Sequence, residues 1–293
     1  MGQLRVVQLN VGSLLEPDWE HRRHEIVAWL NELDADVICF EETWEDPRTS
    51  NTGGWLVEQL PGSWHWRFGG DSFAPSLWPD PALHFGTTIA SRWPIDATAY
   101  HRLPLAPSTN GFVEQIPWEL VHVQTAGLDV FATHLAAGPT DSLHRVQQVL
   151  AIDEIVRRAR GDKDDLVPRG HRPHMPAILC GDFNAEPDCD EIRFLCGLTS
   201  LEGRVTFWQD AWRLAGDGAA GLTQDWRINP IAASMNVHPK RIDYVFVGDP
   251  FQRAGGGGRV LDARVVFDVP RTGVVASDHA GLCVDIAWPN RPA

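Results

Sequence analysis

The first forty residues alternate between strand and helix patterns, and this alternation limits the possible folds more than any other feature. Residues 4–9 and 36–40 are short apolar runs typical of buried strands. Between them a helix is predicted to open at Pro17-Asp18, with apolar residues at helical spacing: Ile26, Val27, Leu30 and Leu33. The order strand, helix, strand indicates an α/β layer with a buried sheet.

The rest of the chain continues both patterns. Strands are predicted at residues 84–95, 120–125, 128–133, 177–180, 241–247, 264–267 and 282–286, with a hairpin around Ala126-Gly127. A second helix is predicted, with Thr140, Asp141 or Ser142 as its cap. Its apolar face carries Val146, Val149, Ile152 and Val156, and Arg145 and Gln148 lie off that face. Asp188 is predicted to cap a short helix. Residues 45–83, which include a small alternating run at 64–68, and residues 203–240 are predicted to be mostly loops, and residues 160–174 a polar linker.

Charge and length restrict the class of protein. The 293 residues are 43% hydrophobic, which allows a substantial core in one domain or two. Lys and Arg number 25 against 39 Asp and Glu, a net charge of −14, and the only lysines are Lys163 and Lys240. Tight nucleic-acid coating is therefore excluded, since phosphate binding needs a cationic face. An enzyme that contacts a phosphodiester locally stays possible, because a bound cation can invert the field of its site.

Five cysteines indicate a reducing compartment. Their number is odd, and no Cys-x-x-Cys pair occurs. Cys39, Cys180 and Cys283 lie in strand-like runs and are predicted to be buried free thiols. The sequence shows neither a signal peptide nor an apolar span of 18 residues, so a cytoplasmic protein without a transmembrane segment is expected.

Polar residues stand at the ends of the predicted strands, where a plain scaffold has no need of them. They are Asn10, Glu42, His134, Asp182 with Asn184, Asp243, and Asp278-His279. Each alone has an ordinary explanation as a turn residue, a solvated acid, a core histidine or an ion-pair partner. Together they fit a ligand site at the carboxyl ends of strands, with oxygen ligands for a hard divalent cation and two histidines for phosphoryl hydrolysis.

The stretch Gly181-Asp182-Phe183-Asn184 places two polar residues at one of these strand ends. It follows the apolar run 177–180, and residues two apart on a strand point the same way, so Asp182 and Asn184 can address one metal ion, water or phosphate. A simple turn after a strand has the same composition.

With these strand ends, the chain resembles the DNase-I-like endonuclease/exonuclease/phosphatase superfamily over residues 4–286. The motifs that carry the resemblance come in the family's order: Leu9-Asn10-Val11, residues 37–43, residues 86–95, Thr133-His134-Leu135 with Arg145 and Gln148, residues 181–184, residues 241–244 and Ser277-Asp278-His279. The resemblance implies a single domain over residues 1–293. It also implies a four-layer α/β/β/α sandwich of two mixed β-sheets, with helices outside and the site at one edge.

The resemblance also implies roles. Glu42 with Asn10 and Asp278 resembles the site of Mg²⁺, for which Mn²⁺ can substitute. Asp182 corresponds to the residue that positions or activates the attacking water, and Asn184 to one that holds Asp182 or a phosphate oxygen. His279, oriented by Asp243, and His134 resemble the histidines that contact the phosphate, and Arg145 is a substrate-binding candidate.

Two positions depart from the family pattern. The family usually has Gln where Glu41 stands, so both Glu41 and Glu42 are candidate metal ligands. The abasic-site endonuclease branch usually has Tyr where His134 stands, which argues against a DNA-repair function.

The predicted function is Mg²⁺-dependent hydrolysis of a phosphoester, above all a phosphodiester, by in-line attack of water. The substrate is left open among nucleic acid, a phospholipid headgroup and a small phosphoester. A phosphomonoesterase of the inositol-phosphatase type and a catalytically idle binding protein are the alternatives. Tryptophans in the loops can stack on bases or touch lipid, although core packing is the default: Trp64, Trp66, Trp78, Trp118, Trp208, Trp212 and Trp226.

Overall fold

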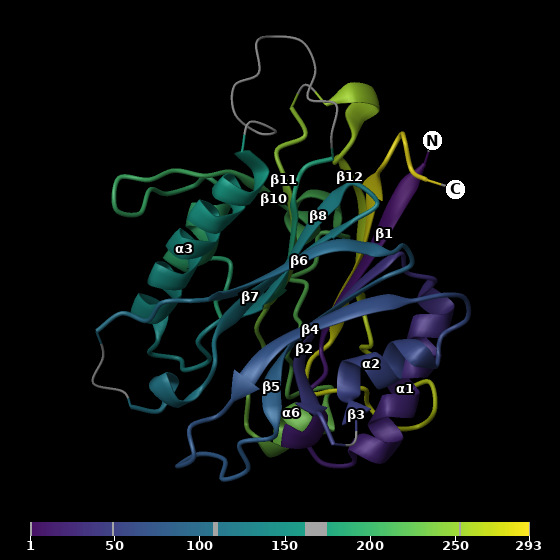
Figure 1. The fold of residues 1–293 in the computed structure, drawn as a ribbon, viewed down its shortest axis with the longest axis vertical. Coiled ribbons are helices and arrows are strands. Elements are labelled where there is room, and N and C mark those ends of the chain that lie inside the picture. Colours follow the sequence, from purple (N-terminus) through teal and green to yellow (C-terminus); the bar gives the residue numbers. More distant parts are fainter. Residues whose placement is uncertain (1, 49, 108–110, 162–174, 252, 293) are drawn as a thin grey trace.

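Two mixed β-sheets pack face to face in the computed structural model of this chain, and helices lie on both outer sides (Figure 1). The structure describes residues 2–48, 50–107, 111–161, 175–251 and 253–292. The predicted fold class, an α/β/β/α sandwich, is confirmed. That residues 1–293 form a single domain stays a prediction.

The first sheet has its strands in the order β12-β13-β1-β2-β5-β4, with β3 paired to β2. Its strands are β1 (Gln3–Asn10), β2 (Val37–Asp46), β3 (Ser50–Asn51), β4 (His65–Ser72), β5 (His84–Ser91), β12 (Val260–Val266) and β13 (Gly281–Ala287). Strands β1 and β2 run parallel, and Asn10 is the register partner of Glu41. The polar ends of these two strands therefore lie next to each other.

The second sheet has the order β10-β11-β9-β8-β7-β6. Its strands are β6 (Ile95–Arg102), β7 (Glu119–Thr125), β8 (Leu128–His134), β9 (Ile178–Asp182), β10 (Trp208–Asp210) and β11 (Asp243–Gly248). Strands β8 and β9 run parallel, with His134 opposite Asp182, and β11 is antiparallel to β9, with Asp243 opposite Asp182. Three of the predicted site residues thus lie side by side in this sheet.

Helices cover the outer faces of the sheets (Figure 1). They are α1 (Trp19–Leu33), α2 (Thr52–Glu58), α3 (Ser142–Arg160), α4 (Asp190–Leu195), α5 (Ala211–Ala215) and α6 (Pro230–Ser234), with short 3-10 turns η1 (Ser13–Leu15), η2 (Val113–Gln115) and η4 (Ala254–Gly256). Helices α1 and α2 share a core with the first sheet, and α3 and α4 share one with the second. Among the described residues, no helix combines the length and the apolar character needed to span a membrane.

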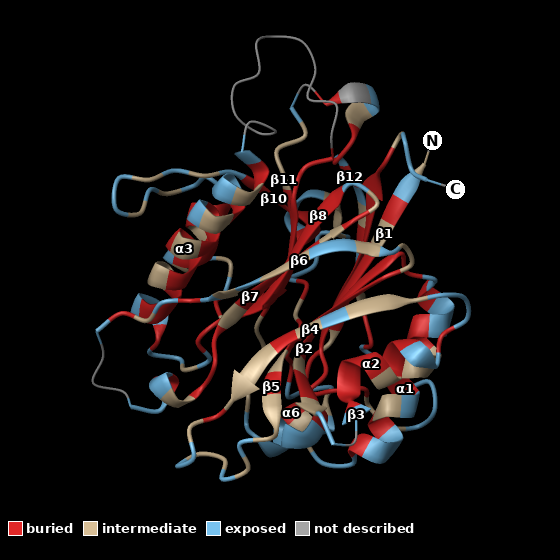
Figure 2. Cartoon of the chain, viewed as in Figure 1, coloured by how far each residue is buried: buried red, intermediate tan, exposed pale blue. Residues whose placement is uncertain are grey.

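Strand β1 is buried along most of its length (Figure 2), and alternation places some of its polar side chains between the sheets. In β1, Val6 belongs to the core between the two sheets, whereas Val7 and Leu9 pack under α1. Gln8 and Asn10 continue the Val6 face, because side chains two apart point the same way. Both are fully buried, so the inner face of β1 changes from apolar to polar as it approaches the site.

Residues 45–83 are less irregular than predicted, because β3, α2 and β4 lie there, although about half of the segment is outside helices and strands. The glycines of β4 weaken its strand pattern but are required by its neighbours. A Cβ on Gly69 would come within 2.5 Å of Val121 Cγ2, and one on Gly70 within 2.4 Å of the Phe85 carbonyl oxygen. Close packing of the strands, which sequence periodicity does not report, overrides the low strand preference of glycine.

Other predicted boundaries also shift. The strand predicted at 84–95 ends at Ser91, and a separate strand, β6, starts at Ile95 in the other sheet. Asp188 does not cap α4, since Cys189 holds the N-cap position, and Asp141 at the N-cap of α3 makes no side-chain cap hydrogen bond. Residues 203–240 contain β10, α5 and α6. Most of the predicted linker, residues 162–174, lies outside the described residues.

The cysteine and tryptophan predictions fare better. All five cysteines are free thiols, and Cys39, Cys180 and Cys283 are buried as expected. Of the seven loop tryptophans, only Trp226 is largely exposed, at 47%, so packing is the main role of the group.

Arg22 of α1 ties together the loops that lead to the polar strand ends. It is 1% exposed, and its guanidinium donates hydrogen bonds to the carbonyl oxygens of Pro17, Val11, Ala276 and Ser13 at 2.7 to 2.9 Å. Its Nη1 also lies 3.3 Å from Glu16 Oε2. One buried cation thus joins the segment after β1 to the segment before β13.

We expect Arg22→Met to lower the free energy of unfolding by about 3 to 5 kcal/mol, because it leaves four carbonyl groups and the Glu16 carboxyl without their partner. Urea unfolding followed by circular dichroism measures the change. Arg158→Met is the matched control, since Arg158 forms an exposed pair with Glu154 and should change stability little. Equal effects of the two substitutions would contradict this account of Arg22.

Candidate functional site

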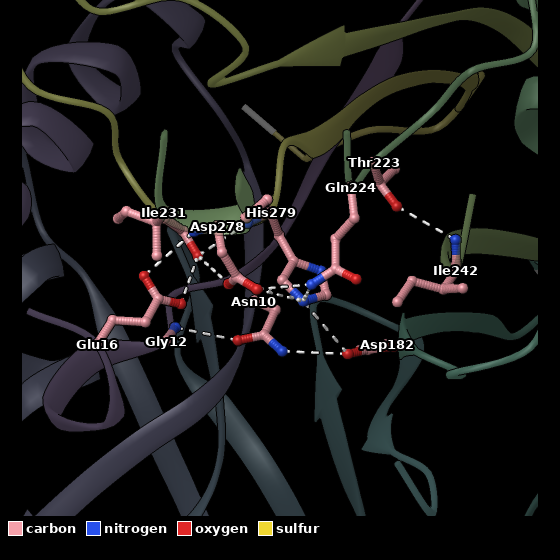
Figure 3. Close-up of polar contacts among 12 residues, drawn as sticks. Asn10, Gly12, Glu16, Asp182, Thr223, Gln224, Ile231, Ile242, Asp278 and His279 are labelled. Atoms are coloured by element: carbon pink, nitrogen blue, oxygen red, sulfur yellow. Dashed lines mark hydrogen bonds and ion pairs between the residues drawn. The ribbon is translucent and has the colours of Figure 1, made fainter. Parts of the chain in front are cut away.

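The predicted site residues meet where the two sheets come together (Figure 3). Asn10 and Glu42 come from the first sheet, and His134, Asp182 and Asp243 from the second. Asp278 and His279 lie in the segment that precedes β13. Residues from distant parts of the sequence thus form one polar cluster.

Asp182 is held at the centre of this cluster. Its Oδ1 accepts a hydrogen bond from the Asn184 backbone N–H (2.8 Å), and its Oδ2 accepts one from Asn10 Nδ2 (3.1 Å). Oδ2 also lies 3.5 Å from His134 Nε2 and 3.8 Å from His279 Nε2. Burial, together with the nearby Asp243 carboxylate, raises the pKa of Asp182. Such a carboxyl is a better proton acceptor than a solvated one.

Asp243 orients His279. The Asp243 Oδ2 atom lies 2.8 Å from His279 Nδ1, so Nε2 is the ring nitrogen that is turned toward Asp182 and Asp278. Burial lowers the pKa of His279, but the carboxylates of Asp243, Asp278 and Asp182 outweigh burial and raise it well above its usual range. The imidazolium form is therefore favoured.

Gln8 connects this pair to the first sheet. Its Nε2 donates to Asp243 Oδ1 (2.9 Å) and to Glu41 Oε2 (2.7 Å), and all three side chains are fully buried. Burial raises the pKa of Glu41 well above its usual range. Glu41 thus faces the interior between the sheets.

Glu42 takes a different direction from Glu41 because the strand bulges. Between Phe40 and Thr43 the pairing of β2 with β5 shifts register, and Glu42 has a φ of 55°. Its Oε1 accepts from Asn10 Nδ2 (3.0 Å) and lies 3.9 Å from His134 Nε2. Burial and the Asp278 carboxylate raise the pKa of Glu42 to about 7.

Asn10 bridges two carboxylates through its amide nitrogen. The orientation is set by Oδ1, which accepts from the Gly12 backbone N–H at 3.0 Å, so Nδ2 must face Glu42 and Asp182. In this arrangement Asn10 positions both carboxylates, and direct coordination of a metal by its oxygen stays a prediction.

Glu16 is a further acid at this edge that the sequence did not single out. Its Oε2 accepts from the Asp278 backbone N–H at 3.1 Å. Burial and a hydrogen bond with the Asp278 side chain raise the pKa of Glu16 to about 10. Asp278 is the ionised partner, since His279 and this hydrogen bond lower its pKa even though burial opposes them.

His134 has two buried ring nitrogens with no hydrogen-bond partner in the described part of the chain. Burial lowers its pKa, so the neutral ring is favoured. Its ring packs against Phe85 and Trp118. Buried polar atoms are nearly always satisfied, and a ring nitrogen left open toward Asp182 and Glu42 indicates that a ligand or water belongs there.

Two predicted residues lie beside the cluster rather than in it. The Asn184 side chain donates to the Leu135 carbonyl oxygen (3.1 Å), while its backbone holds Asp182. Arg145 is buried, pairs with Glu191 (3.1 Å) and donates to the carbonyl oxygens of Ala136 and Gly138. Both residues brace the loop after His134. Substrate contact by either stays a prediction.

The arrangement can accept a divalent cation. Asp182, Asp243 and His279 offer ligand atoms within 4.8 Å of one another, a group that could bind a metal. Asp243, however, already bonds His279 and Gln8 through its two oxygens. Glu42 and Asp278 both offer carboxylate oxygens, the ligand type that a hard divalent cation prefers. The two carboxylates repel each other, and a bound cation would relieve this repulsion.

The residues that sequence reasoning missed are Gln8, Glu16 and Gln224. Gln224 lies over the cluster, with its Nε2 2.6 Å from Asp278 Oδ2 and 2.7 Å from His279 Nε2 (Figure 3). Gln8 carried a signal, because it is a polar residue on the apolar face of a strand. Glu16 and Gln224 lie in loops, which have no alternation of apolar and polar residues, so a polar residue there does not stand out in the sequence.

The chain is similar to known proteins of one family. A family profile described as "Endonuclease/Exonuclease/phosphatase family" matches residues 7–279. No curated protein matches the chain.

Several solved structures have a similar fold. An endonuclease/exonuclease/phosphatase from Beutenbergia cavernae DSM 12333 has 21% identity and a TM-score of 0.67, over 98% of this chain and 72% of that one. TDP2 of D. rerio, complexed with a single-strand DNA product, has 17% identity and a TM-score of 0.69, over 98% and 100%. The human Nocturnin catalytic domain, with a bound sulfate anion, has 18% identity and a TM-score of 0.65, over 97% and 93%.

We expect the metal-free protein to lose stability as the pH rises from about 4.5 to 7. The pKa of Glu42 is near 7 in the fold, against an ordinary 4.5, so the folded state binds this proton more tightly than the unfolded state. Glu42 alone then lowers the free energy of unfolding by about 1.4 kcal/mol per pH unit at most over this interval, and the raised pKa values of Glu16, Glu41 and Asp182 act in the same direction. Urea unfolding in EDTA at several pH values measures the slope.

Glu42→Gln should flatten that slope, and Glu58→Gln, an exposed change on α2, should leave it as it is. An unaltered slope in Glu42→Gln would mean that this carboxyl does not titrate as described.

Proposed function

This chain belongs to the endonuclease/exonuclease/phosphatase family, and we propose that it is a Mg²⁺-dependent phosphoesterase that acts above all on phosphodiesters. Mn²⁺ is the expected substitute ion. The observation that supports the proposal most is that Asp182, His134 and His279 converge within 4 Å while His134 has both ring nitrogens unsatisfied. An anionic tetrahedral group suits that space, since it offers acceptor oxygens to the two rings.

Glu42 and Asp278 are the proposed ligands of the ion, with Asn10 setting the direction of Glu42. When bound, Mg²⁺ supplies Lewis-acid stabilisation of the charge that develops on the phosphate and leaving oxygens. The proposed role of Glu41 is different, since its side chain bonds Gln8 between the sheets.

The protein's own groups have the proposed roles of base and charge stabiliser. Asp182 aims a water and takes its proton, since two hydrogen bonds fix the carboxylate and its raised pKa favours protonation. His279, held by Asp243, places a positive charge beside the phosphate oxygens. His134 donates a neutral ring N–H to the same group. Asn184 and Arg145 keep the loop between His134 and α3 in place.

A cavity of about 490 Å³ beside Asp278 offers room for part of the substrate. Its walls include Leu222, Val265 and Phe267. Among the described residues that line it, Arg264 is the only cation, and it pairs with Asp262 at 2.9 Å. An apolar or uncharged substituent fits such walls better than further phosphate groups, which favours a phosphodiester over an inositol polyphosphate.

The solved relatives support the same class of substrate. The D. rerio TDP2 structure holds a single-strand DNA product, and the Nocturnin structure holds a sulfate anion. We place the activity in the cytoplasm, in keeping with the five free cysteines.

We expect Asp182→Asn and His279→Ala each to lower kcat for bis-p-nitrophenyl phosphate by about 10² to 10⁴, the range for lost acid–base or charge-stabilising groups. EDTA should abolish hydrolysis, and Mg²⁺ or Mn²⁺ should restore it. Release of p-nitrophenol measures the rates, and circular dichroism checks the fold.

Asp96→Asn and His21→Ala are the matched controls, because both side chains are exposed and neither lies in the cluster or the proposed substrate cavity. Full activity in both site variants would contradict the proposal. An inactive wild-type protein that binds phosphate would also contradict it, because a catalytically idle binding protein behaves in this way. A panel of DNA, RNA, sphingomyelin and inositol phosphates, with and without Mg²⁺, assigns the substrate and separates diesterase from monoesterase activity.

A further inference from the structure

The amide of Gln224 lies where a substrate must approach His279. Its nitrogen is 2.7 Å from His279 Nε2 and 2.6 Å from Asp278 Oδ2, and the residue is buried (Figure 3). Nε2 is the only ring nitrogen of His279 available to a substrate, because Nδ1 is bonded to Asp243. Gln224 therefore occupies the position that faces the open end of the Asp243–His279 pair.

The backbone holds Gln224 firmly in this position. Gln224 and Lys240 exchange hydrogen bonds of 3.0 and 2.9 Å, and the Ala280 N–H donates to the Thr223 carbonyl oxygen at 2.6 Å. The Thr223 hydroxyl oxygen accepts from the backbone N–H groups of Ile242 (3.2 Å) and Asp243 (3.3 Å). The loop is thus fastened both to the start of β11 and to the residue after His279, so its placement over the site follows from the fold.

We propose that Gln224 is a substrate-contacting residue, whose side-chain N–H donates a hydrogen bond to a non-bridging oxygen of the phosphoester. The inference rests on the proposed function, in that it names a further contact of the same substrate. A phosphate oxygen that reaches His279 Nε2 must enter the space beside the Gln224 amide, which is already within 2.7 Å of that atom.

The donor geometry supports this role. The Gln224 nitrogen faces the Asp278 carboxylate, which only accepts, so the amide orientation that presents N–H groups to the site is fixed. An amide nitrogen has two hydrogens. One stays with Asp278. The other faces His279 Nε2, which accepts it only when that nitrogen carries no proton, so with His279 protonated this hydrogen is left for the incoming oxygen. Gln224 then links the proposed metal ligand to the phosphate without adding charge.

Two substitutions separate this role from a structural one. Gln224→Met keeps the length of the side chain but removes its donors, and Gln224→Glu keeps the shape but adds a negative charge. At saturating Mg²⁺, we expect Gln224→Met to raise KM for bis-p-nitrophenyl phosphate by about 10- to 100-fold, the effect of losing one hydrogen bond to a charged group. Gln224→Glu should raise it further, because the carboxylate repels the phosphate.

The matched controls are Gln59→Met and Gln59→Glu, the same changes at an exposed glutamine at the end of α2. Their KM should equal that of the wild type. If Gln224→Met changes only the Mg²⁺ concentration needed for activity, and KM at saturating Mg²⁺ stays the same, Gln224 serves Asp278 alone and the inference is wrong. The wild-type rate tests the proposed function separately.

A binding measurement tests the contact without turnover. In ¹H–¹⁵N spectra, the Gln224 side-chain amide is the pair of signals missing from Gln224→Met. Titration of the wild-type protein with inorganic phosphate in the presence of Mg²⁺ should move this pair, and the pair of Gln59 should stay. A Gln224 pair that stays in place while other site signals move overturns the inference, as does phosphate binding of equal strength in Gln224→Glu.

Discussion

The hydrogen-bonded chain from His279 through Asp243 and Gln8 to Glu41 is the interaction on which the site depends. It begins before β13, passes through β11 of the second sheet and ends on β1 and β2 of the first. Because it crosses the seam between the sheets, it fixes their relative position at the point where the chemistry is proposed. In a low-dielectric interior such linked bonds are strong, and a missing partner is costly.

These hydrogen bonds lie at one end of the apolar core between the sheets. The core between the sheets is formed by residues such as Val6, Val37 and Val130, and it turns polar only at the last positions of the strands. Acids outnumber bases there, so the cluster carries unbalanced negative charge out of water. The three apolar cores provide the stability that allows this arrangement, and a cation bound there would offset part of the negative charge.

Strand ends were predictable from the sequence because they depend on local patterns. The apolar runs that end at Asn10 and Asp182, and the run that begins after Asp243, are visible without a structure, and the strand pairings bring these residues together. What a given side chain contacts was not predictable in the same way. Only the first half of β4 was visible, as the alternating run 64–68, because the glycines of its second half are required by tight contacts with other strands. Gln224 was missed because it lies in a loop.

The same limit applies to Arg145. The resemblance made it a substrate-binding candidate, which stays a prediction, and in the structure its donors bond Glu191 and two loop carbonyl groups. A sequence shows that a positively charged side chain is present, but not whether it forms an ion pair with a buried acid elsewhere in the chain.

The bulge in β2 decides which of two identical neighbours reaches the site. One extra residue between Phe40 and Thr43, with Glu42 in a left-handed conformation, lets Glu41 and Glu42 both leave the strand on the inner side yet point at different partners. In a regular strand their side chains would lie on opposite faces of the sheet. The different contacts of the two glutamates thus depend on the backbone, and a single-residue deletion that restored the regular strand would turn one of them to the outer face of the sheet without altering either side chain.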